Sequence, residues 1–353
     1  MTAPTAASSL WPEVLGHLLR REDLEAEVVE RAMSAILEGQ ASDAQIAGFA
    51  VALRAKGETA AELAAIVRTM MRYATRVDAP VDGPLVDTCG TGGDRSGTVN
   101  VSTMAALVAA GAGVRVAKHG NRAASSDCGS ADVLEALGVV IDLGPDGVRR
   151  CIDEAGIGFC FAPRFHSAMR FAGPARRELG APTTFNFLGP LANPAGARRQ
   201  ALGVSDPAMA ERMTGALADL GTERALVFYG HDGLDELTVT TTSTVLDLEG
   251  DEVRTYVVDP VELGIKPAEL AALAGGDAAG NAQVAHQVLA GKHGPVRDIV
   301  ALNAAAALVV GDVAADLAEG VEAAQSSIED GRAAAALDAF VRVSVAAREA
   351  EAE

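Results

Sequence analysis

Residues 86–103 read VDTCGTGGDRSGTVNVST and place a glycine-rich loop between a short apolar strand and a predicted helix. Gly90, Gly92 and Gly93 permit positive φ angles and let backbone N–H groups approach an anion without a Cβ in the way. Residues 100–103 are expected to open the helix, whose free N–H groups and dipole attract negative charge. The segment predicts a diphosphate site, with a purely structural glycine turn as the alternative.

Acidic side chains accompany this loop. Asp94 would repel a phosphate, so it suits sugar hydroxyls or a cation bound to the diphosphate. Residues 230–238, GHDGLDELT, place Asp235 and Glu236 together after another predicted strand and a turn. Mg²⁺ prefers oxygen ligands shared with substrate phosphates, so this pair predicts a magnesium site; on its own it is more often a solvated acidic loop.

A second polar segment, KHGNRAASSDCGSADVLEALG at residues 118–138, also follows a predicted strand. Lys118 and Arg122 supply cations, and small residues such as Ser125 and Ser126 supply donors that lead into a helix. A second phosphate site is expected here, with a polar loop that caps a helix as the alternative. His119 and Asn121 are suited to a different group of the ligand, such as a carboxylate or an amine.

The order of predicted elements indicates an α/β protein with a small helical unit at its N-terminus. Residues up to about 80 show only helical periodicity, starting near Trp11, and two capping boxes open helices there: Ser42 with Gln45, and Thr59 with Glu62. The connector DAPVDGP at 78–84 marks a boundary. Strands and helices then alternate, which indicates a mostly parallel sheet with helices on both faces. The predicted strands are 85–86, 114–117, 158–161 and 225–229, the helices are 130–137 and 207–220, a hairpin covers 245–258, and 298–353 is helical.

Composition narrows the class of protein. The chain has 353 residues and a formal net charge of −19, which disfavours a nucleic-acid partner. Only four cysteines are present, none in a CxxC pair, so free thiols in a reducing, cytoplasmic setting are expected. The sequence shows neither a secretory signal pattern nor an apolar run of about 18 residues, so no membrane association is predicted.

Five blocks carry a family resemblance: GTGGD at 90–94, NVST at 100–103, KHGNR at 118–122, FNFLGPLANP at 185–194 and DGLDE at 232–236. Their order resembles the anthranilate phosphoribosyltransferase family over about residues 10–310. The resemblance implies a fold like that of the nucleoside phosphorylases and phosphoribosyltransferases. It also implies a helical domain at 9–82 that forms a homodimer, with helices near 166–196 packed on it, and an α/β catalytic domain at 83–350.

The resemblance implies a magnesium-dependent enzyme of tryptophan biosynthesis, which joins anthranilate to phosphoribosyl pyrophosphate. It implies anthranilate contacts at Gly90, His119, Asn121 and Arg176, and Mg²⁺ contacts at Ser102, Asp235 and Glu236. The phosphoribosyl pyrophosphate contacts that it implies are Gly90, Gly93, Asp94, Thr98, Asn100, Val101, Ser102, Thr103, Lys118, His119, Gly120, Asn121, Arg122, Ala123, Ala124, Ser125 and Ser126.

Two positions depart from the family pattern, and two other protein classes remain open. The family commonly has an arginine where this chain has Pro182, so any role of that arginine is absent, and Cys89 replaces a frequent aliphatic residue. Arg176 and Arg177 are neighbours, and on sequence alone such a pair is more often surface charge. A pyrimidine nucleoside phosphorylase would need a nucleobase pocket, and a non-catalytic nucleic-acid-binding relative would be expected to be basic and to lose the GTGGD loop.

Overall fold

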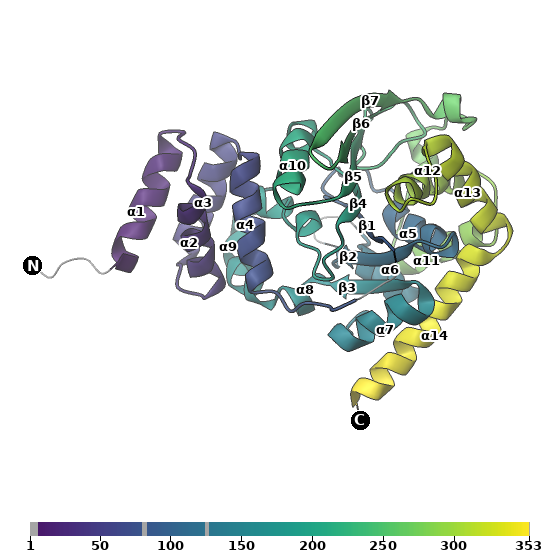
Figure 1. The fold of residues 1–353 in the computed structure, drawn as a ribbon, viewed down its shortest axis with the longest axis horizontal. Coiled ribbons are helices and arrows are strands. Elements are labelled where there is room, and N and C mark those ends of the chain that lie inside the picture. The colour runs from purple at the N-terminus through teal and green to yellow at the C-terminus, as the bar shows by residue number, and fades with distance from the viewer. Residues whose placement is uncertain (1–5, 80–82, 124–126, 353) are drawn as a thin grey trace, which may run out of the picture.

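A computed structural model describes residues 6–79, 83–123 and 127–352 and shows a helical bundle beside a larger α/β unit (Figure 1). The bundle contains α1 (Ala6–Leu19), α2 (Ala26–Leu37), α3 (Asp43–Lys56) and α4 (Ala60–Arg72). Both predicted capping boxes are confirmed, since Ser42 caps α3 with Gln45 and Thr59 caps α4 with Glu62. The first helix begins at Ala6 rather than near Trp11, and Pro12 lies inside it.

A seven-stranded sheet forms the centre of the larger unit, in the order β3-β2-β1-β4-β5-β6-β7. The first five strands in this order are parallel, and β6 and β7 extend them as an antiparallel hairpin, as predicted for 245–258. The strand bounds are β1 Leu85–Gly90, β2 Arg115–Gly120, β3 Ile157–Phe161, β4 Arg199–Gly203, β5 Arg224–Gly230, β6 Ser243–Glu249 and β7 Glu252–Val258. The predicted class, a helical unit plus a mostly parallel α/β unit, is confirmed.

Helices cover both faces of this sheet. The α-helices of the larger unit are α5 (Val101–Gly111), α6 (Ser130–Ala136), α7 (Pro145–Ala155), α8 (Ala162–Phe165), α9 (Gly173–Leu179), α10 (Pro207–Asp219), α11 (Ala278–Leu289), α12 (Pro295–Val310), α13 (Leu317–Glu329) and α14 (Arg332–Ala352). Short 3₁₀ turns are η1 (Ser167–Ala172), η2 (Thr184–Asn186), η3 (Gly189–Leu191), η4 (Pro260–Leu263) and η5 (Leu270–Leu273). None of the helices in the described parts of the chain is long and apolar enough to cross a membrane.

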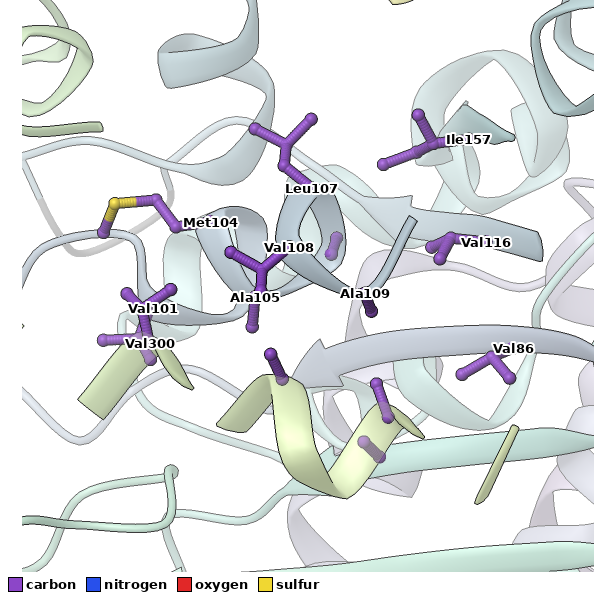
Figure 2. Packing of buried hydrophobic residues seen from close by; sticks show 14 of the residues in the cluster. Val86, Val101, Met104, Ala105, Leu107, Val108, Ala109, Val116, Ile157 and Val300 are labelled. Atoms are coloured by element: carbon purple, nitrogen blue, oxygen red, sulfur yellow. The ribbon is translucent and has the colours of Figure 1, made fainter. Parts of the chain in front are cut away.

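Two hydrophobic clusters hold these layers together. Alternate residues of one strand point to opposite faces, so Leu226 and Phe228 of β5 join one cluster and Ala225 and Val227 join the other. The first cluster packs the sheet against α5, α12 and α14; Figure 2 shows its centre, where small alanines let α5 approach α12 closely. The second cluster continues through α10 into the bundle, so the bundle is attached to one face of the sheet.

The segment between β3 and β4 makes the remaining attachment. In it, η1 contacts α2, while α9 and η2 contact α3. This segment therefore lies between the bundle and the sheet, although residues on both sides of it belong to the larger unit. It contains the FNFLGPLANP block and Arg176, which places both next to the junction of the two units.

Candidate active site

The strand order reverses between β1 and β4, and the loops that follow these two strands meet at their carboxyl ends. Gly90 ends β1 opposite Gly203, which ends β4, and the N–H of Thr91 donates to the carbonyl of Gly203 at 3.0 Å. Such a reversal point is where open α/β sheets bind ligands, because the flanking loops diverge there and leave room between them. The sequence placed the glycine loop after a strand, but it did not reveal the neighbouring strand β4.

The acidic loop after β5 packs directly onto these two glycines. Oδ2 of Asp235 accepts a hydrogen bond from the N–H of Gly92 at 2.6 Å. A Cβ added at Gly90 would lie 2.4 Å from that same oxygen, and one added at Gly203 would lie 1.7 Å from the backbone carbonyl oxygen of Asp235. Both glycines are therefore required by close approach of the acidic loop, at φ values that any residue could adopt.

The second acid of the pair joins this loop to the next helix. Oε1 of Glu236 accepts a hydrogen bond from the N–H of Ser102 at 3.2 Å, in the first turn of α5. The hydroxyl of Ser102 accepts from Nζ of Lys118 at 3.3 Å, and the carbonyl of Thr88 accepts from the same ammonium. The glycine loop, the acidic loop, the start of α5 and strand β2 are thus connected by hydrogen bonds of Asp235, Glu236, Ser102 and Lys118.

The charges in this cluster are perturbed by their surroundings. Burial, followed by repulsion from Asp94, raises the pKa of Asp235 to about 7. Burial, followed by repulsion from Asp235, also raises the pKa of Glu236 well above its ordinary value. Burial lowers the pKa of Lys118, which is only 2% exposed, although Asp87 opposes this shift. Buried carboxyl groups thus outnumber the one buried ammonium, and burial and repulsion favour the protonated form of both Asp235 and Glu236.

The rest of the glycine loop is held by its own side chains and by distant segments. Asp94 accepts from the hydroxyl of Ser96 at 2.7 Å, and Thr98 forms an isolated bridge with Ala274. Asn100 donates to the carbonyl of Cys128 at 3.0 Å. Of the other predicted contacts here, Val101 is buried, Gly93 is exposed, and the hydroxyl of Thr103 is buried with no hydrogen-bond partner in the described structure.

His119 lies deeper, at the end of β2. Its Nδ1 is 2.9 Å from the carbonyl oxygen of Gly189 in η3, while the buried Nε2 has no partner among the described residues. Burial is the main reason that its pKa falls to about 3; the neighbouring His166, whose ring centre is 5.2 Å away, adds to the shift. His119 is therefore neutral at pH 7, and one of its ring nitrogens is unpaired among the described residues.

The loop after β2 turns away from this centre. Asn121 is exposed and its side-chain oxygen accepts from the N–H of Arg122 at 2.8 Å. The guanidinium of Arg122 pairs with Asp132 and Glu135, both at 2.9 Å, so it is not brought to Lys118 in this structure. Gly120 ends the strand, and the N–H of Ala123 donates to Asp132. Ala124, Ser125 and Ser126 lie outside the described residues.

Arg176 is partly buried on α9 near the bundle, and its guanidinium lies 5.8 Å from the centre of the Phe185 ring. Burial lowers its pKa. Phe185 and the His119 partner Gly189 belong to one ten-residue stretch, FNFLGPLANP, so this stretch contacts two of the predicted anthranilate residues. Arg176 is the more buried of the two neighbouring arginines, and Arg177 is exposed.

Two supporting residues were not predicted from the sequence. Asp87 is fully buried in β1 and accepts from the N–H of His119 at 3.1 Å and from the amide of Asn193 at 2.8 Å. Asn303 of α12 holds the acidic loop, since it accepts from the N–H of Leu237 and donates to that residue's carbonyl. A signal for Asp87 was present, because an acid in the middle of an apolar strand needs a buried partner.

The acidic residues fit a magnesium ion that is completed by its substrate. Asp235 and Glu236 are neighbouring carboxylates whose burial and mutual repulsion a divalent cation would relieve. Among the residues that the structure describes, no three His, Cys, Asp or Glu side chains gather closely enough to hold a metal ion by themselves. Mg²⁺ typically takes one or two protein carboxylates and completes its shell with water and phosphate oxygens, which is the donor set available here.

Sequence comparisons agree with this two-unit architecture. Residues 12–74 match the family model described as "Glycosyl transferase family, helical bundle domain", and residues 82–334 match "Glycosyl transferase family, a/b domain". The fold and the strand-end site thus define a glycosyltransferase of the two-domain type that joins a helical bundle to an α/β unit.

Individual relatives are more specific. An anthranilate phosphoribosyltransferase from a Nocardioides species is 56% identical and covers 94% of this chain and 98% of its own, and that from Acidothermus cellulolyticus is 56% identical and covers 99% of both. A crystal structure of the enzyme from Thermus thermophilus is 43% identical, covers 94% of this chain and 99% of its own, and superposes with a TM-score of 0.89. A Saccharomyces cerevisiae structure in complex with PRPP and Mg is 28% identical, covers 96% and 98%, and has a TM-score of 0.88. The chain belongs to the anthranilate phosphoribosyltransferase family.

Proposed function

We propose that this chain uses these residues to transfer the phosphoribosyl group of 5-phosphoribosyl 1-pyrophosphate to the amine of anthranilate, with release of pyrophosphate. The observation that carries the proposal is the set of bonds that links the glycine loop, the acidic loop, α5 and β2: Gly92 to Asp235, and Glu236 to Ser102 to Lys118. A phosphate-type glycine loop, an acidic loop and a buried ammonium together suit a doubly phosphorylated sugar that carries a divalent cation.

Phosphoribosyl pyrophosphate is proposed to lie along the carboxyl end of β1. Backbone N–H groups of the glycine loop and of the first turn of α5 would donate to its phosphate oxygens, and Lys118 would add a positive charge close to Ser102. Thr103, whose buried hydroxyl has no partner in the described structure, is a candidate donor. Residues 118–126 are proposed to close over this substrate; for Arg122 this requires release from Asp132 and Glu135.

Mg²⁺ is proposed as the cofactor, held by Ser102, Asp235 and Glu236 together with phosphate oxygens. When bound, it neutralises charge that develops on the departing pyrophosphate. The carboxylates orient towards the glycine loop through the bonds at Gly92 and Ser102. The Saccharomyces cerevisiae relative with PRPP and Mg bound supports this assignment.

Anthranilate is proposed to lie between His119, Asn121, Gly90 and Arg176. An arylamine is unprotonated at neutral pH, so the site needs to position the nitrogen and stabilise charge rather than supply a strong base. A neutral His119 fits this requirement, since its Nε2 is free to contact the ligand. Arg176 would pair with the substrate carboxylate. A Saccharomyces cerevisiae relative in complex with 4-fluoroanthranilate supports the substrate class.

Several wider features remain proposals. We propose a helical domain at 9–82 that mediates a homodimer, an α/β catalytic domain at 83–350, and a place in tryptophan biosynthesis in the cytoplasm. Cys89, Cys151 and Cys160 are free and buried in the structure, which supports a reducing compartment.

One assay tests the reaction. The purified protein is mixed with Mg²⁺, phosphoribosyl pyrophosphate and anthranilate, and the loss of anthranilate fluorescence is followed. Arg176→Ala should raise the Michaelis constant for anthranilate and leave that for phosphoribosyl pyrophosphate nearly unchanged, because it removes a contact to one substrate only. No loss of fluorescence with the wild-type protein would refute the reaction, and equal effects on both constants would remove the Arg176 assignment.

The two rival classes are not favoured. The relatives with more than half of their residues identical are anthranilate phosphoribosyltransferases over nearly their whole length, rather than pyrimidine nucleoside phosphorylases. The glycine loop that a non-catalytic relative would lose is present and hydrogen-bonded to Asp235. Phosphorolysis of pyrimidine nucleosides by the purified protein, without turnover of anthranilate, would show that the protein is a pyrimidine nucleoside phosphorylase instead.

A further inference from the structure

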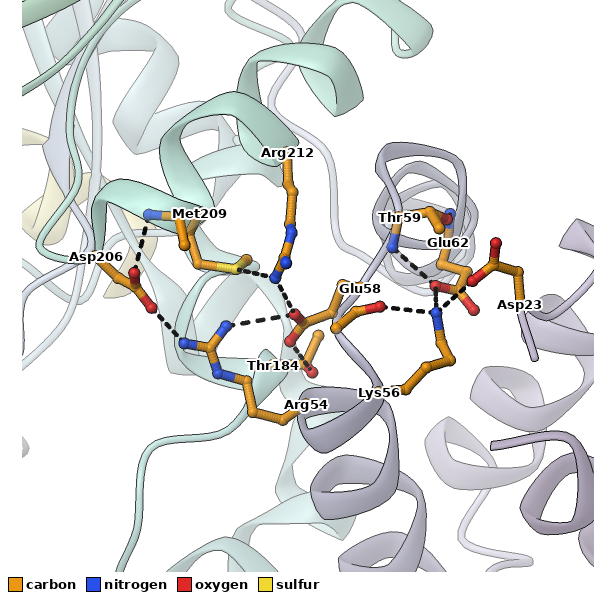
Figure 3. A network of polar contacts seen from close by, with 12 residues as sticks. Asp23, Arg54, Lys56, Glu58, Thr59, Glu62, Thr184, Asp206, Met209 and Arg212 are labelled. Carbon is orange, nitrogen blue, oxygen red and sulfur yellow. Dashed lines mark hydrogen bonds and ion pairs between the residues drawn. The ribbon is translucent and has the colours of Figure 1, made fainter. Parts of the chain in front are cut away.

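A buried carboxylate of the helical bundle reaches into the larger unit. Glu58 lies in the connection between α3 and α4, and its side chain is fully buried. Its Oε1 accepts a hydrogen bond from the hydroxyl of Thr184 at 2.5 Å, and its Oε2 accepts from Arg54 at 3.3 Å and from Arg212 at 3.2 Å (Figure 3). Thr184 opens η2, and Arg212 lies on α10, so Glu58 connects the bundle to two segments of the other unit.

Charges in this group are balanced. Arg54 also pairs with Asp206 at the start of α10, so two guanidinium groups face two carboxylates. The segment 180–187, GAPTTFNF, contains no cation of its own. The positive charge next to Thr184 and Glu58 therefore comes from Arg54 and Arg212. The guanidinium carbon of Arg54 also lies 5.0 Å from the centre of the Phe187 ring.

A second buried carboxylate, that of Glu62 in the first turn of α4, behaves differently. Glu62 accepts from the N–H groups of Leu24 at 2.9 Å and Thr59 at 2.8 Å and from Nζ of Lys56 at 2.9 Å. All of these partners belong to the bundle, as Figure 3 shows for Lys56 and Thr59. Glu62 thus stabilises the bundle alone, while Glu58 crosses the junction. Glu62 therefore offers a control for substitutions that break the contact between Glu58 and Thr184.

The turn that Glu58 holds supports Arg176. Phe185 follows Thr184 directly, and its ring lies 5.8 Å from the Arg176 guanidinium. Among the described residues, that guanidinium has no hydrogen-bond or ion-pair partner, so its position depends on packing against this ring. A shift of η2 would move the ring and with it the guanidinium. Small displacements of a group that positions a substrate are costly to catalysis.

We propose that Glu58 and Thr184 are positioning residues for anthranilate: their hydrogen bond fixes η2, and η2 fixes Phe185 beneath Arg176. The proposal rests on the function proposed above and deepens it, because it assigns part of the helical bundle to recognition of one substrate. Phosphoribosyl pyrophosphate binding is independent of this joint, since its proposed contacts lie on β1, β2, α5 and the loops that follow β1 and β2.

The test uses Thr184→Val, which keeps the shape of the side chain and removes its hydroxyl. The Michaelis constant for anthranilate should rise about tenfold, which corresponds to about 1.4 kcal/mol, and that for phosphoribosyl pyrophosphate should stay within about twofold. Thr184→Ser keeps the hydroxyl, so both of its Michaelis constants should equal those of the wild type. Backbone amides of residues 184–187 should exchange with deuterium faster in Thr184→Val than in the wild type, which is a readout that does not need turnover.

Glu62→Gln is the matched control, because it neutralises the neighbouring buried carboxylate without touching η2. It should leave both Michaelis constants and the exchange of 184–187 unchanged. The proposal is overturned if Thr184→Val changes neither the anthranilate constant nor the exchange, or if Glu62→Gln reproduces its effects. Should Arg176→Ala itself leave the anthranilate constant unchanged, the proposed role of Arg176 has failed, and the positioning proposal fails with it. Faster exchange in Thr184→Val would then show that the joint holds η2 for some other purpose.

Discussion

A single methyl group added at Gly90 should displace the carboxylate of Asp235 directly. The Cβ of Gly90→Ala would lie 2.4 Å from Oδ2 and 3.1 Å from Cγ of Asp235. An ordinary contact is about 3.5 Å, so the carboxylate must move by about 1 Å. That oxygen is held by the N–H of Gly92 at 2.6 Å, and the movement would break the bond.

The size of the effect follows from these contacts. Loss of a hydrogen bond to a carboxylate costs about 1.5–3 kcal/mol, and overpacking a close contact costs about 1–3 kcal/mol. Because the carboxylate relieves part of the clash by moving, the two costs do not add fully, and the free energy of unfolding should fall by about 2–4 kcal/mol. Displacement of a proposed magnesium ligand should also lower kcat/KM about 100-fold at limiting Mg²⁺, which is about 2.7 kcal/mol.

Urea unfolding and the fluorescence assay at several Mg²⁺ concentrations measure both effects. Gly276→Ala is the control, because a Cβ there meets nothing within 4 Å, and it should change stability by no more than about 0.5 kcal/mol. Raised Mg²⁺ should recover part of the activity of Gly90→Ala. Unchanged stability together with an unchanged magnesium requirement would show that Gly90 does not position Asp235.

Two further predictions concern the charges of the site. Replacing both Asp235 and Glu236 by Ala should abolish turnover at ordinary magnesium, because it removes both carboxylates that are proposed to hold the ion; turnover at the wild-type rate would contradict their role. Burial holds the pKa of His119 at about 3, whereas the unfolded chain binds that proton near pH 6.5. The unfolded state therefore gains a proton first as the pH falls, and stability drops below about pH 6.5 by up to about 1.4 kcal/mol per pH unit. His119→Gln should show a shallower loss of unfolding free energy between about pH 6 and pH 4, and identical slopes would refute the buried neutral histidine.

Much of the fold was predictable because its signals are local. The capping boxes at Ser42 and Thr59 and the alternation of apolar strands with helical segments depend on neighbouring residues, and the structure confirms them. Strand β4 was missed. Its sequence, RQALG, begins with Arg199 and Gln200, which are tolerated only because Asp312 pairs with the arginine and the carbonyl of Pro190 accepts from Gln200. Neither partner belongs to the strand itself, so its own pattern does not reveal them.

The residues of the site were likewise predictable from the sequence only where the signal is local. The sequence by itself determined which loops carry phosphate-type glycines, acids and cations, because each loop directly follows a strand and the backbone demands of such turns are local. Only the tertiary structure decided that Gly90 and Gly203 end neighbouring strands, that Asp235 packs onto both, and that Glu58 of the bundle reaches Thr184. Strand order and the junction of the two units depend on packing between segments far apart in the chain, and the periodicity of any one segment contains no record of its distant partners.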